Sequence, residues 1–380
     1  MLGTMVGDES AGTFRPRDEA ELGELLRAPG PSFELVAGGT KRGIGRPVDA
    51  PILDLSGLSG IVDYQPGELV LTARPATALV QIEALIAEQC QRFGFEPPAP
   101  ALGGSTQLQT IGGVLMANSS GSRRVTAGSA RDHFIGLRGV NGRGETFVGG
   151  GRVVKNVTGF DLPKVLAGSW GTLAALTQIT VRLVPAAEFE STLFFESASV
   201  AAAVMLCSEA LGSMFEVSCA AFLPRRGVAV RLEGLATSVQ SRITGLLTAL
   251  DRPARGVLAG ADSRQFWRAV AAAEGLAKFP VIWRLSVAPQ QAARILDEIE
   301  PEDFQLDWGG GLIWMGAHLL DARRVRGALH GGHATLVRAA QAERRANAVF
   351  EPQSSGIAAI AAGLKAAFDP DNRLNPGRMG

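Results

Sequence analysis

The order of apolar and polar residues divides the chain into two parts, which differ in how the predicted strands and helices follow one another. In the first part, short apolar runs typical of strands alternate with segments whose apolar positions recur at helical spacing. The predicted helices span residues 15–27 and 79–91, and the predicted strands are Phe33–Ala37, Pro51–Leu55, Gly60–Tyr64 and Glu68–Ala73. This early alternation predicts a mixed α/β unit.

Two further apolar stretches complete the first part. Strand candidates Ile135–Val140 and Thr146–Val148 are joined through Asn141-Gly142-Arg143-Gly144, which is a strong hairpin signal. The stretch Leu173–Val184 mixes β-branched and apolar residues and stops at Pro185. The sequence therefore predicts a hairpin followed by one long strand.

After Pro185 the pattern becomes a regular succession of strands and Ala- and Leu-rich helices, which predicts a separate α+β domain. The predicted strands are Ser191–Phe195, Val228–Leu232, Val281–Ser286 and Gly311–Met315, and the helices lie near 198–212, 237–250 and 289–299. A last helix, 355–368, ends at Asp369-Pro370. We expect domains at residues 1–187 and 188–335, followed by a C-terminal segment at 336–380.

Composition excludes several classes of protein. Of the 380 residues, 46% are hydrophobic, so a large core is available and wholesale disorder is excluded. Lys+Arg and Asp+Glu both number 37, so the chain lacks the positive excess of a general nucleic-acid binder. Neither the acidic start, with Asp8 and Glu9, nor Ser197–Phe215 predicts a signal peptide or a membrane span. We expect a cytoplasmic protein whose membrane association, if any, comes through a partner.

Cysteine and histidine are too few and too scattered for a metal centre. Cys90, Cys207 and Cys219 have unrelated spacings, and the chain has four histidines. No zinc or iron–sulfur site is expected, and the three thiols are expected to be reduced and packed. His133 remains an outside candidate for chemistry, whereas His318 is expected in the core; His330 and His333 are expected in an exposed loop.

Glycine is the informative excess, with 47 residues gathered in three clusters. The first, Val36–Lys41, follows a predicted strand and can present free backbone N–H groups to phosphate oxygens. The second covers Leu102–Gln107, Thr110–Gly113 and Ala117–Gly121, and the third covers Gly149–Leu162 and Ala167–Leu173. No P-loop or G-x-G-x-x-G motif occurs. Each cluster alone fits either a tight turn or a cofactor contact.

Taken in order, the clusters resemble the FAD-binding domain of the vanillyl-alcohol-oxidase (PCMH) type, and within it the FAD-binding subunit of bacterial glycolate oxidase. Pieces that carry the resemblance include Ala37–Lys41, Leu53–Ser56, Ile111–Gly113, Gly150–Leu162, Ala167–Leu173 and Leu374–Gly377. The fold class that this resemblance implies is α+β: a PCMH-type FAD-binding domain of two α/β subdomains with a smaller ferredoxin-like α+β cap, and a C-terminal segment that returns to the FAD domain.

The resemblance also implies a cofactor site. The implied FAD contacts are Gly38, Gly39, Thr40, Lys41, Gly104, Ser105, Thr110, Gly113, Asn118, Gly159 and Ile179. Some relatives attach FAD covalently through a histidine in the first loop. Because Thr40 stands at that position and no cysteine lies in the clusters, we expect non-covalent FAD.

The chain departs from the family pattern where related 2-hydroxyacid dehydrogenases carry catalytic histidines. Asp307 and Trp314 stand at the two histidine positions of the cap motif, and Ser355 stands at the histidine of the C-terminal motif. Since Trp accepts no proton and an unassisted Ser is a poor base, the expected acid–base groups are missing and the catalytic residues stay unknown.

The resemblance implies a subunit of a complex that oxidises glycolate to glyoxylate. The implied partners are a catalytic FAD-bearing subunit and an iron–sulfur subunit, so this chain would hold flavin, transfer electrons or serve assembly. Two alternatives remain open: a self-sufficient FAD-dependent dehydrogenase of another substrate, and a non-enzymatic scaffold. The fold-sharing enolpyruvyl reductase is a poor match, because the sequence carries no nicotinamide-binding signal.

Overall fold

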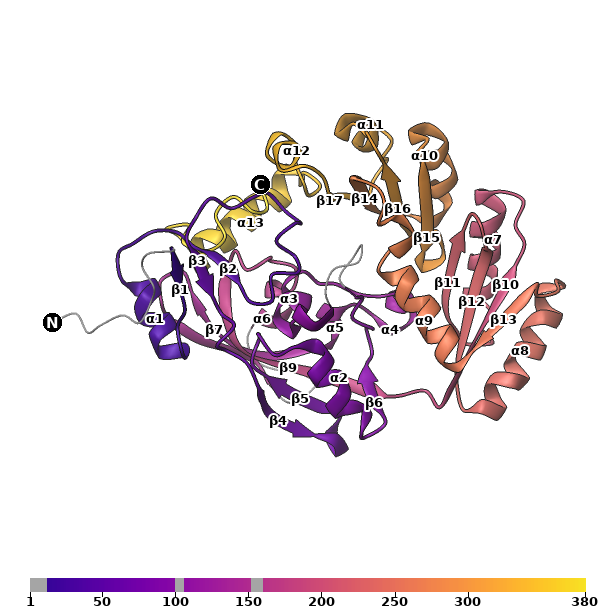
Figure 1. Ribbon diagram of the computed structural model, residues 1–380, viewed down its shortest axis with the longest axis horizontal. Coiled ribbons are helices and arrows are strands. Elements are labelled where there is room, and N and C mark those ends of the chain that lie inside the picture. Colours follow the sequence, from indigo (N-terminus) through magenta and orange to yellow (C-terminus); the bar gives the residue numbers. More distant parts are fainter. Residues whose placement is uncertain (1–11, 100–105, 152–159) are drawn as a thin grey trace.

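The computed structural model of the protein describes residues 12–99, 106–151 and 160–380, and within them the chain forms three sheets (Figure 1). The smallest is parallel, with strands in the order β1 (Thr13–Phe14), β3 (Ile52–Asp54) and β2 (Glu34–Val36). Helix α1 (Glu19–Arg27) contributes Leu22 and Leu26 to the core beside this sheet. Its Asp18 side chain accepts a hydrogen bond from the Glu21 backbone N–H, which caps the helix.

The second sheet has antiparallel pairings. Its order is β4 (Ile61–Gln65), β5 (Val70–Ala73), β9 (Ala174–Pro185), β7 (Phe134–Asn141) and β8 (Thr146–Gly150), and β6 (Gln91–Phe93) pairs with β9. Five helices accompany it: α2 (Leu79–Ala87), α3 (Ile111–Met116), α4 (Arg124–Ala127), α5 (Ala130–His133) and α6 (Leu162–Leu166). The predicted hairpin is confirmed as β7–β8, and the predicted long strand as β9. The helix predicted over 79–91 ends at Ala87, because Gln91–Phe93 pairs with β9 instead.

The third sheet forms the domain that follows Pro185, which we call the cap. Its antiparallel strands run β13 (Gly256–Ala259), β10 (Phe189–Phe195), β12 (Gly227–Gly234), β11 (Val217–Leu223), β15 (Asp303–Asp307), β16 (Leu312–Ala317), β14 (Val281–Ser286) and β17 (His333–Arg338). Its helices are α7 (Val200–Leu211), α8 (Ala236–Leu250), α9 (Gly260–Ala271), α10 (Ala292–Ile299) and α11 (Ala322–Gly327). In Figure 1 the cap lies beside the first two sheets rather than on top of them.

Short 3₁₀ turns link several of these elements. They are Pro66–Glu68, Thr106–Leu108, Glu274–Leu276, Pro289–Gln291 and Trp308–Gly310. The last of them joins β15 to β16 and places Trp308 at the boundary between the cap and the first part of the chain, where its indole Nε1 donates a hydrogen bond to the Gly121 carbonyl at 3.0 Å.

The C-terminal segment returns to the first sheet, as the resemblance implied. After α12 (Gln341–Ala346) and α13 (Ser355–Phe368), Leu374 pairs with Phe33 in a parallel bridge. The buried Asp369 carboxylate accepts hydrogen bonds from the backbone N–H groups of Arg373 and Leu374 and from Lys365 Nζ. These bonds fix the turn after α13, and beyond it Arg378 donates hydrogen bonds to the carbonyls of Lys41 and Ile44 in the loop that follows β2.

A buried ionic cluster joins the cap to the second sheet. Arg231 of β12 is 2% exposed and places its Nη2 2.7 Å from Glu96 Oε2. Neighbouring Glu233 accepts from Arg92 at 2.5 Å and lies 3.4 Å from Arg123, so cap and non-cap residues alternate through the cluster. A buried arginine that lost these carboxylates would be an unpaired charge, so the cluster defines how the cap sits against the second sheet.

Candidate functional site: two joined cavities between the first loop and the cap

The loop after β2 contains the first glycine cluster and forms one wall of an inner cavity. A Cβ added at Gly38 would lie 1.5 Å from the Leu108 carbonyl oxygen, so any side chain here would separate the loop from the segment that precedes α3. Gly39 has φ +70°, a conformation that residues with a Cβ adopt at a cost. The two glycines are therefore required for different reasons, close approach at one and left-handed backbone at the other.

Helix α3 forms the facing wall, and glycine is again required by close packing. The Thr110 side chain caps the helix by accepting a hydrogen bond from the Gly113 backbone N–H at 3.3 Å. A Cβ at Gly112 would lie 2.7 Å from the Pro75 side chain. These contacts hold α3 beside the first loop, with the segment between Pro75 and Leu79 against its start.

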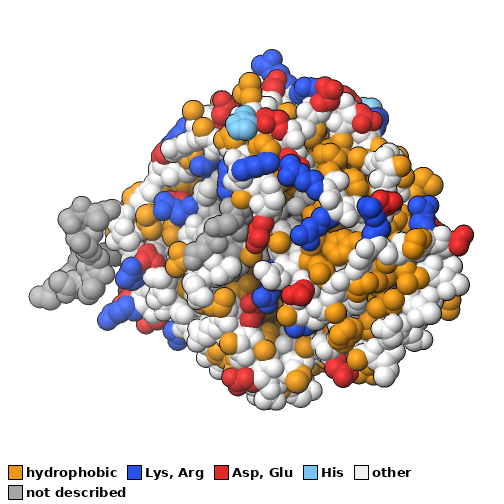
Figure 2. All heavy atoms as spheres, turned by 45° about the vertical axis from the view of Figure 1, so that its right-hand side comes forward, with side chains coloured by type: hydrophobic (Ala, Val, Ile, Leu, Met, Phe, Trp, Pro, Cys, Tyr) orange, Lys and Arg blue, Asp and Glu red, His pale blue; other side chains and the backbone are white. Residues whose placement is uncertain are grey.

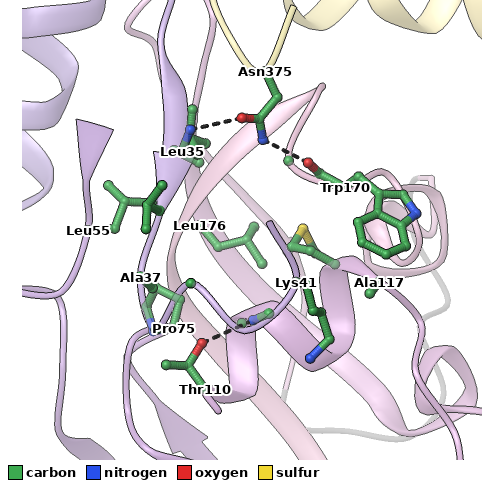
Figure 3. A pocket seen from close by; sticks show the side chains of 18 of the residues that line it. Leu35, Ala37, Lys41, Leu55, Pro75, Thr110, Ala117, Trp170, Leu176 and Asn375 are labelled. Atoms are coloured by element: carbon green, nitrogen blue, oxygen red, sulfur yellow. Dashed lines mark hydrogen bonds between the residues drawn. The ribbon is translucent and has the colours of Figure 1, made fainter. Parts of the chain in front are cut away.

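The inner cavity has a volume of about 130 Å³ and is completed by residues distant in sequence. Asn375 bridges two of its walls: its side-chain oxygen accepts from the Leu35 N–H, and its side-chain nitrogen donates to the Trp170 carbonyl, each at 2.8 Å (Figure 3). Figure 3 shows Leu55 and Pro75 on one side of this space, with Ala117 and Trp170 on the other. The C-terminal return is thus part of the site.

A larger cavity of about 630 Å³ adjoins the inner one and extends to the cap. Thr40, Lys41, Ala117 and Trp170 line both cavities, so the two meet along these residues. Cap residues from β14, β16, β17 and the turn after β15 supply much of the far wall. Together the cavities form an elongated space whose narrow end is built from glycine-rich loops and whose wide end faces the cap.

The structure brings together most of the site residues that the resemblance implied. Six of them line the inner cavity: Gly38, Gly39, Thr40, Lys41, Thr110 and Gly113. Asn118 lines the larger one. Ile179 is fully buried in β9 between Leu137 and Ala73 and lines neither cavity. Gly104, Ser105 and Gly159 lie outside the described residues.

Lys41 carries the positive charge at the junction of the cavities. Its ammonium forms no ion pair or hydrogen bond with any residue in the described part of the chain, and burial lowers its pKa to about 8. A desolvated cation without a counter-ion is costly, and a bound anion would remove that cost. An elongated cofactor with a charged pyrophosphate fits this arrangement, because the loops admit backbone contact and Lys41 supplies the charge.

The cap wall holds a second set of charges, which the sequence had left without a role. Asp307 is fully buried and accepts hydrogen bonds from Ser122 Oγ at 2.6 Å and from the Trp308 N–H at 2.7 Å. Burial raises its pKa to about 6. Arg284, in the middle of β14, also lines the larger cavity, and burial lowers its pKa to about 10.

Sequence reasoning missed Arg284, although a signal was present. It is the one charged residue of the strand Val281–Ser286, whose other residues before Ser286 are apolar, and a core strand offers no place for a guanidinium. A charged residue in a buried strand indicates that its side chain either lines a cavity or forms a buried ion pair. The structure shows that Arg284 lines a cavity.

The remaining candidates fall outside the site or at its margin. His133 is buried against Phe95, and its Nε2 lies 2.8 Å from the Ala127 carbonyl, so it is structural. The expectation of a core position for His318 is wrong: its side chain is 73% exposed and pairs with Glu302, because it follows the last residue of β16. His333 is exposed as expected, but it is the first residue of strand β17 rather than a loop residue, and it lines the larger cavity.

Two further expectations are corrected or limited by the structure. Cys90 is exposed rather than packed, whereas Cys207 and Cys219 are buried as expected. Ser355 is the exposed first residue of α13 and lines neither cavity.

Among residues 12–99, 106–151 and 160–380, no group of three or more His, Cys, Asp or Glu side chains is placed to hold a metal ion, and no helix there is long and apolar enough to cross a membrane.

Comparison with known proteins agrees with this geometry. A family model described as an FAD binding domain matches residues 10–150. The chain is 32% identical to glycolate oxidase subunit GlcE of Escherichia coli (strain K12), over 95% of this chain and 97% of the relative. It is 31% identical to glycolate oxidase subunit GlcD of Bacillus subtilis (strain 168), over 41% of this chain and 32% of that one.

The fold has solved counterparts. An alkyldihydroxyacetonephosphate synthase structure superposes with a TM-score of 0.65 at 12% identity, over 96% of this chain and 76% of that chain. At this level of identity the match concerns the fold alone, and it covers the cap and the C-terminal return as well as the first two sheets.

Proposed function

Because the chain belongs to the family of the glycolate oxidase subunit GlcE, we propose that it is the flavin-holding subunit of a complex that oxidises glycolate to glyoxylate and passes the electrons to an iron–sulfur partner. Residues 10–150 are an FAD binding domain, which makes the chain a flavoprotein of the FAD-linked oxidoreductases. The observation that carries the proposal is the meeting of the two cavities at Lys41, because this residue lines both the glycine-walled inner cavity and the larger cavity that extends to the cap.

The chain's own residues have distinct tasks in this proposal. The backbone of Gly38 and Gly39 and the ammonium of Lys41 bind the pyrophosphate, and the Asn375 bridge holds that wall in place. When bound, FAD supplies a two-electron acceptor. The cap wall excludes bulk water from the wider cavity, with Trp308 and Trp314 as its apolar part.

The flavin is held without a covalent bond. Thr40 stands in the first loop, and no cysteine is among the described residues that line either cavity. The cavity histidine, His333, belongs to the cap rather than to the first loop. Acid precipitation should therefore release all flavin into the supernatant, and yellow colour that stays in the washed pellet would contradict this assignment.

Exposed apolar surface supports a role within a complex. Figure 2 shows hydrophobic side chains spread broadly over one face, interrupted by Lys and Arg side chains. On α13, Ile357 and Ile360 are 55% and 67% exposed, and none of the residues of this helix is buried. An apolar helix so exposed in the single chain is typical of a surface that a partner covers.

The experiment is purification of the tagged chain from its native host under mild conditions, followed by flavin and iron analysis and identification of the proteins retained. We expect about one FAD per chain, a second flavin-bearing subunit and an iron-containing subunit. A matched pull-down with the double variant Ile357→Glu/Ile360→Glu should keep FAD and lose the partners. Wild-type protein that purifies without flavin would refute the proposal.

A second candidate, a self-sufficient dehydrogenase, is favoured by one observation. Asp307 lines the larger cavity with a pKa raised to about 6 by burial, which is suited to accepting a proton near neutral pH. Anaerobic mixing of the isolated flavin-loaded chain with glycolate or D-lactate separates the two. Rapid bleaching without partners supports self-sufficiency, and bleaching only in the reassembled complex supports the subunit role.

A further inference from the structure

Two arginines that line the larger cavity form no ion pair within the described part of the chain. Arg284 of β14 and Arg124, the first residue of α4, both line this cavity. Neither guanidinium forms an ion pair or a side-chain hydrogen bond with any residue that the structure describes. Burial lowers the pKa of each, so both cations are held in partly desolvated positions without the partners that ordinarily compensate them.

The two guanidinium groups face the same aromatic ring. The Arg124 group lies 4.8 Å from the centre of the Trp308 ring, and the Arg284 group lies 4.9 Å from it. Trp314 is 5.9 Å from Arg284 on the neighbouring strand. Stacking on an aromatic face holds a guanidinium in a fixed plane while leaving its N–H edge free, which is the edge that binds carboxylates.

The register of the cap sheet places polar and apolar groups around Arg284. Arg284 pairs with Trp314 of β16 on one side and with Thr335 of β17 on the other. Directly paired residues project to the same face of a sheet, and all three line the cavity. Ser286, two residues along β14, lines it as well. This face therefore offers one cation, two hydroxyls and an aromatic wall, a set suited to a small polar acid.

Two carboxylates act on these arginines through their charge, Asp307 on Arg284 and Asp132 on Arg124, and neither forms an ion pair with them in the described part of the chain. Asp307 raises the pKa of Arg284 through its charge, but its two oxygens are occupied by Ser122 Oγ and the Trp308 N–H. Arg124 acts in the opposite direction and lowers the pKa of Arg284. Asp132 raises the pKa of Arg124 through its charge, but its Oδ2 accepts hydrogen bonds from the Ser129 N–H and from Ser129 Oγ. Neither carboxylate forms an ion pair with either arginine, so the N–H edges of both guanidinium groups stay available to a ligand.

We propose that the larger cavity binds a small carboxylate beside Trp308, held by the guanidinium groups of Arg284 and Arg124. Arg284 belongs to the cap and Arg124 to the first part of the chain, so the ligand would join the two. This inference rests on the proposed function in one respect, because under that function the bound carboxylate is the carboxylate of the 2-hydroxy acid. The binding itself needs no turnover.

The test is anion binding to the flavin-loaded chain as purified, followed by tryptophan fluorescence and by calorimetry at constant ionic strength. Oxalate is the probe because it has two carboxylates and no hydroxyl to oxidise, and glycolate and its neutral amide, glycolamide, are compared. We expect oxalate and glycolate to quench fluorescence and glycolamide to bind at least tenfold more weakly. Equal binding of glycolamide and glycolate overturns the inference.

Three variants locate the site. Arg284→Gln and Arg124→Gln should each weaken oxalate binding by about tenfold to a hundredfold, the range of a lost charge-assisted hydrogen bond. Arg284→Lys should recover part of that loss. Arg255→Gln is the matched control, since Arg255 is an exposed cap arginine paired with Glu196, and it should bind oxalate as the wild type does. Unchanged oxalate affinity in both glutamine variants overturns the inference, even where one of them folds poorly.

Two further measurements distinguish carboxylate binding from unselective anion binding and from flavin binding by the same arginines. Inorganic phosphate that binds as tightly as oxalate would mean an unselective anion site and would overturn the assignment to carboxylates. Flavin content is measured in every variant: if Arg284→Gln loses flavin together with oxalate binding, the arginine serves the cofactor and the inference fails. A wild type without flavin refutes the proposed function, whereas oxalate affinity still decides the carboxylate site.

Discussion

Replacement of Lys41 by Met tests the cofactor end of the site. The variant keeps the length and the apolar stem of the side chain and removes the one charge that lines both cavities. Since the ammonium forms no ion pair or hydrogen bond with the described residues, its removal leaves no carboxylate unpaired there, and the fold should be retained. The loss is then confined to the anion that the ammonium would bind.

The magnitude follows from the missing interaction. A hydrogen bond to a charged group contributes about 1.5–3 kcal/mol, and 1.4 kcal/mol is a factor of ten in affinity. The variant should therefore bind FAD about ten- to a hundredfold more weakly than the wild type. Lys278→Met is the matched control, because Lys278 is an exposed lysine of the cap paired with Asp303, and its FAD affinity should not change.

The pH dependence gives a second, independent prediction. In the free chain, burial lowers the pKa of Lys41 to about 8 from its ordinary 10.5, and an adjacent phosphate would raise it again. Below pH 8 the free chain already carries the proton, so affinity for FAD should be level. Above pH 8 binding must take up a proton, so the affinity of the wild type should fall with rising pH, while that of Lys41→Met should not.

The assay is titration of flavin-free protein with FAD, followed by the quenching of flavin fluorescence, between pH 6.5 and pH 9.5. Lys41→Met binding within twofold of the wild type, or the same pH profile in both proteins, would falsify the role of Lys41. Circular dichroism of both proteins excludes a general loss of structure as the cause of a weaker affinity.

Three other changes test further parts of the structure. Gly38→Ala should abolish flavin retention, because its Cβ would meet the Leu108 carbonyl at 1.5 Å, whereas Gly43→Ala, with no atom within 4 Å, should keep the wild-type ratio of flavin to protein absorbance. Arg231→Met should lower the free energy of unfolding in urea by about 3–5 kcal/mol by leaving Glu96 unpaired at the cap boundary. The pKa of Asp307 is raised from 3.8 to about 6 in the folded chain, so the cost of its charge to stability is absent below about pH 4 and complete above pH 6. Between these limits the wild type should lose about 3 kcal/mol of stability relative to Asp307→Asn. Parallel pH profiles of the free energy of unfolding in urea for the two proteins would contradict the burial argument.

The parts of the fold that the sequence predicted well have strong local signals. Helix α13 was expected over 355–368 and is observed at Ser355–Phe368, because an uninterrupted Ala-rich run ends at Asp369-Pro370. The β7–β8 hairpin follows from its Asn-Gly turn between apolar runs. In both cases the residues that define the element are neighbours in sequence.

The elements that were missed depend on partners distant in sequence. Strand β15, Asp303–Asp307, has only two apolar residues and is recognised by its pairing with β16 and β11. Strand β6 interrupts what the pattern presents as the end of a helix, because it pairs with β9 nearly a hundred residues later. Short strands whose stability comes from pairing carry little signal of their own.

The candidate site shows the same division. Glycine clusters predicted the inner cavity, since Gly38 and Gly39 are required by backbone geometry that leaves a mark in the sequence. Asn375 and Arg124 could not be placed there in advance, because only the C-terminal return and the docking of the cap bring them to the cavities. Residue type predicts what a side chain can bind, whereas tertiary packing decides whether it faces a cavity.

The wall of the larger cavity contains the two positions at which the resemblance led us to expect histidines. At the two motif positions the chain has Asp307 and Trp314, and the structure places both in the wall of the larger cavity together with Arg284. A pocket that had only lost its function would be expected to fill with apolar side chains, because unpaired buried cations are costly. Instead, the larger cavity is lined by the guanidinium groups of Arg284 and Arg124, which form no ion pair within the described part of the chain, and by the buried carboxylate of Asp307, whose pKa is raised to about 6. Charges held at such a cost support the proposal that this cavity binds a small carboxylate.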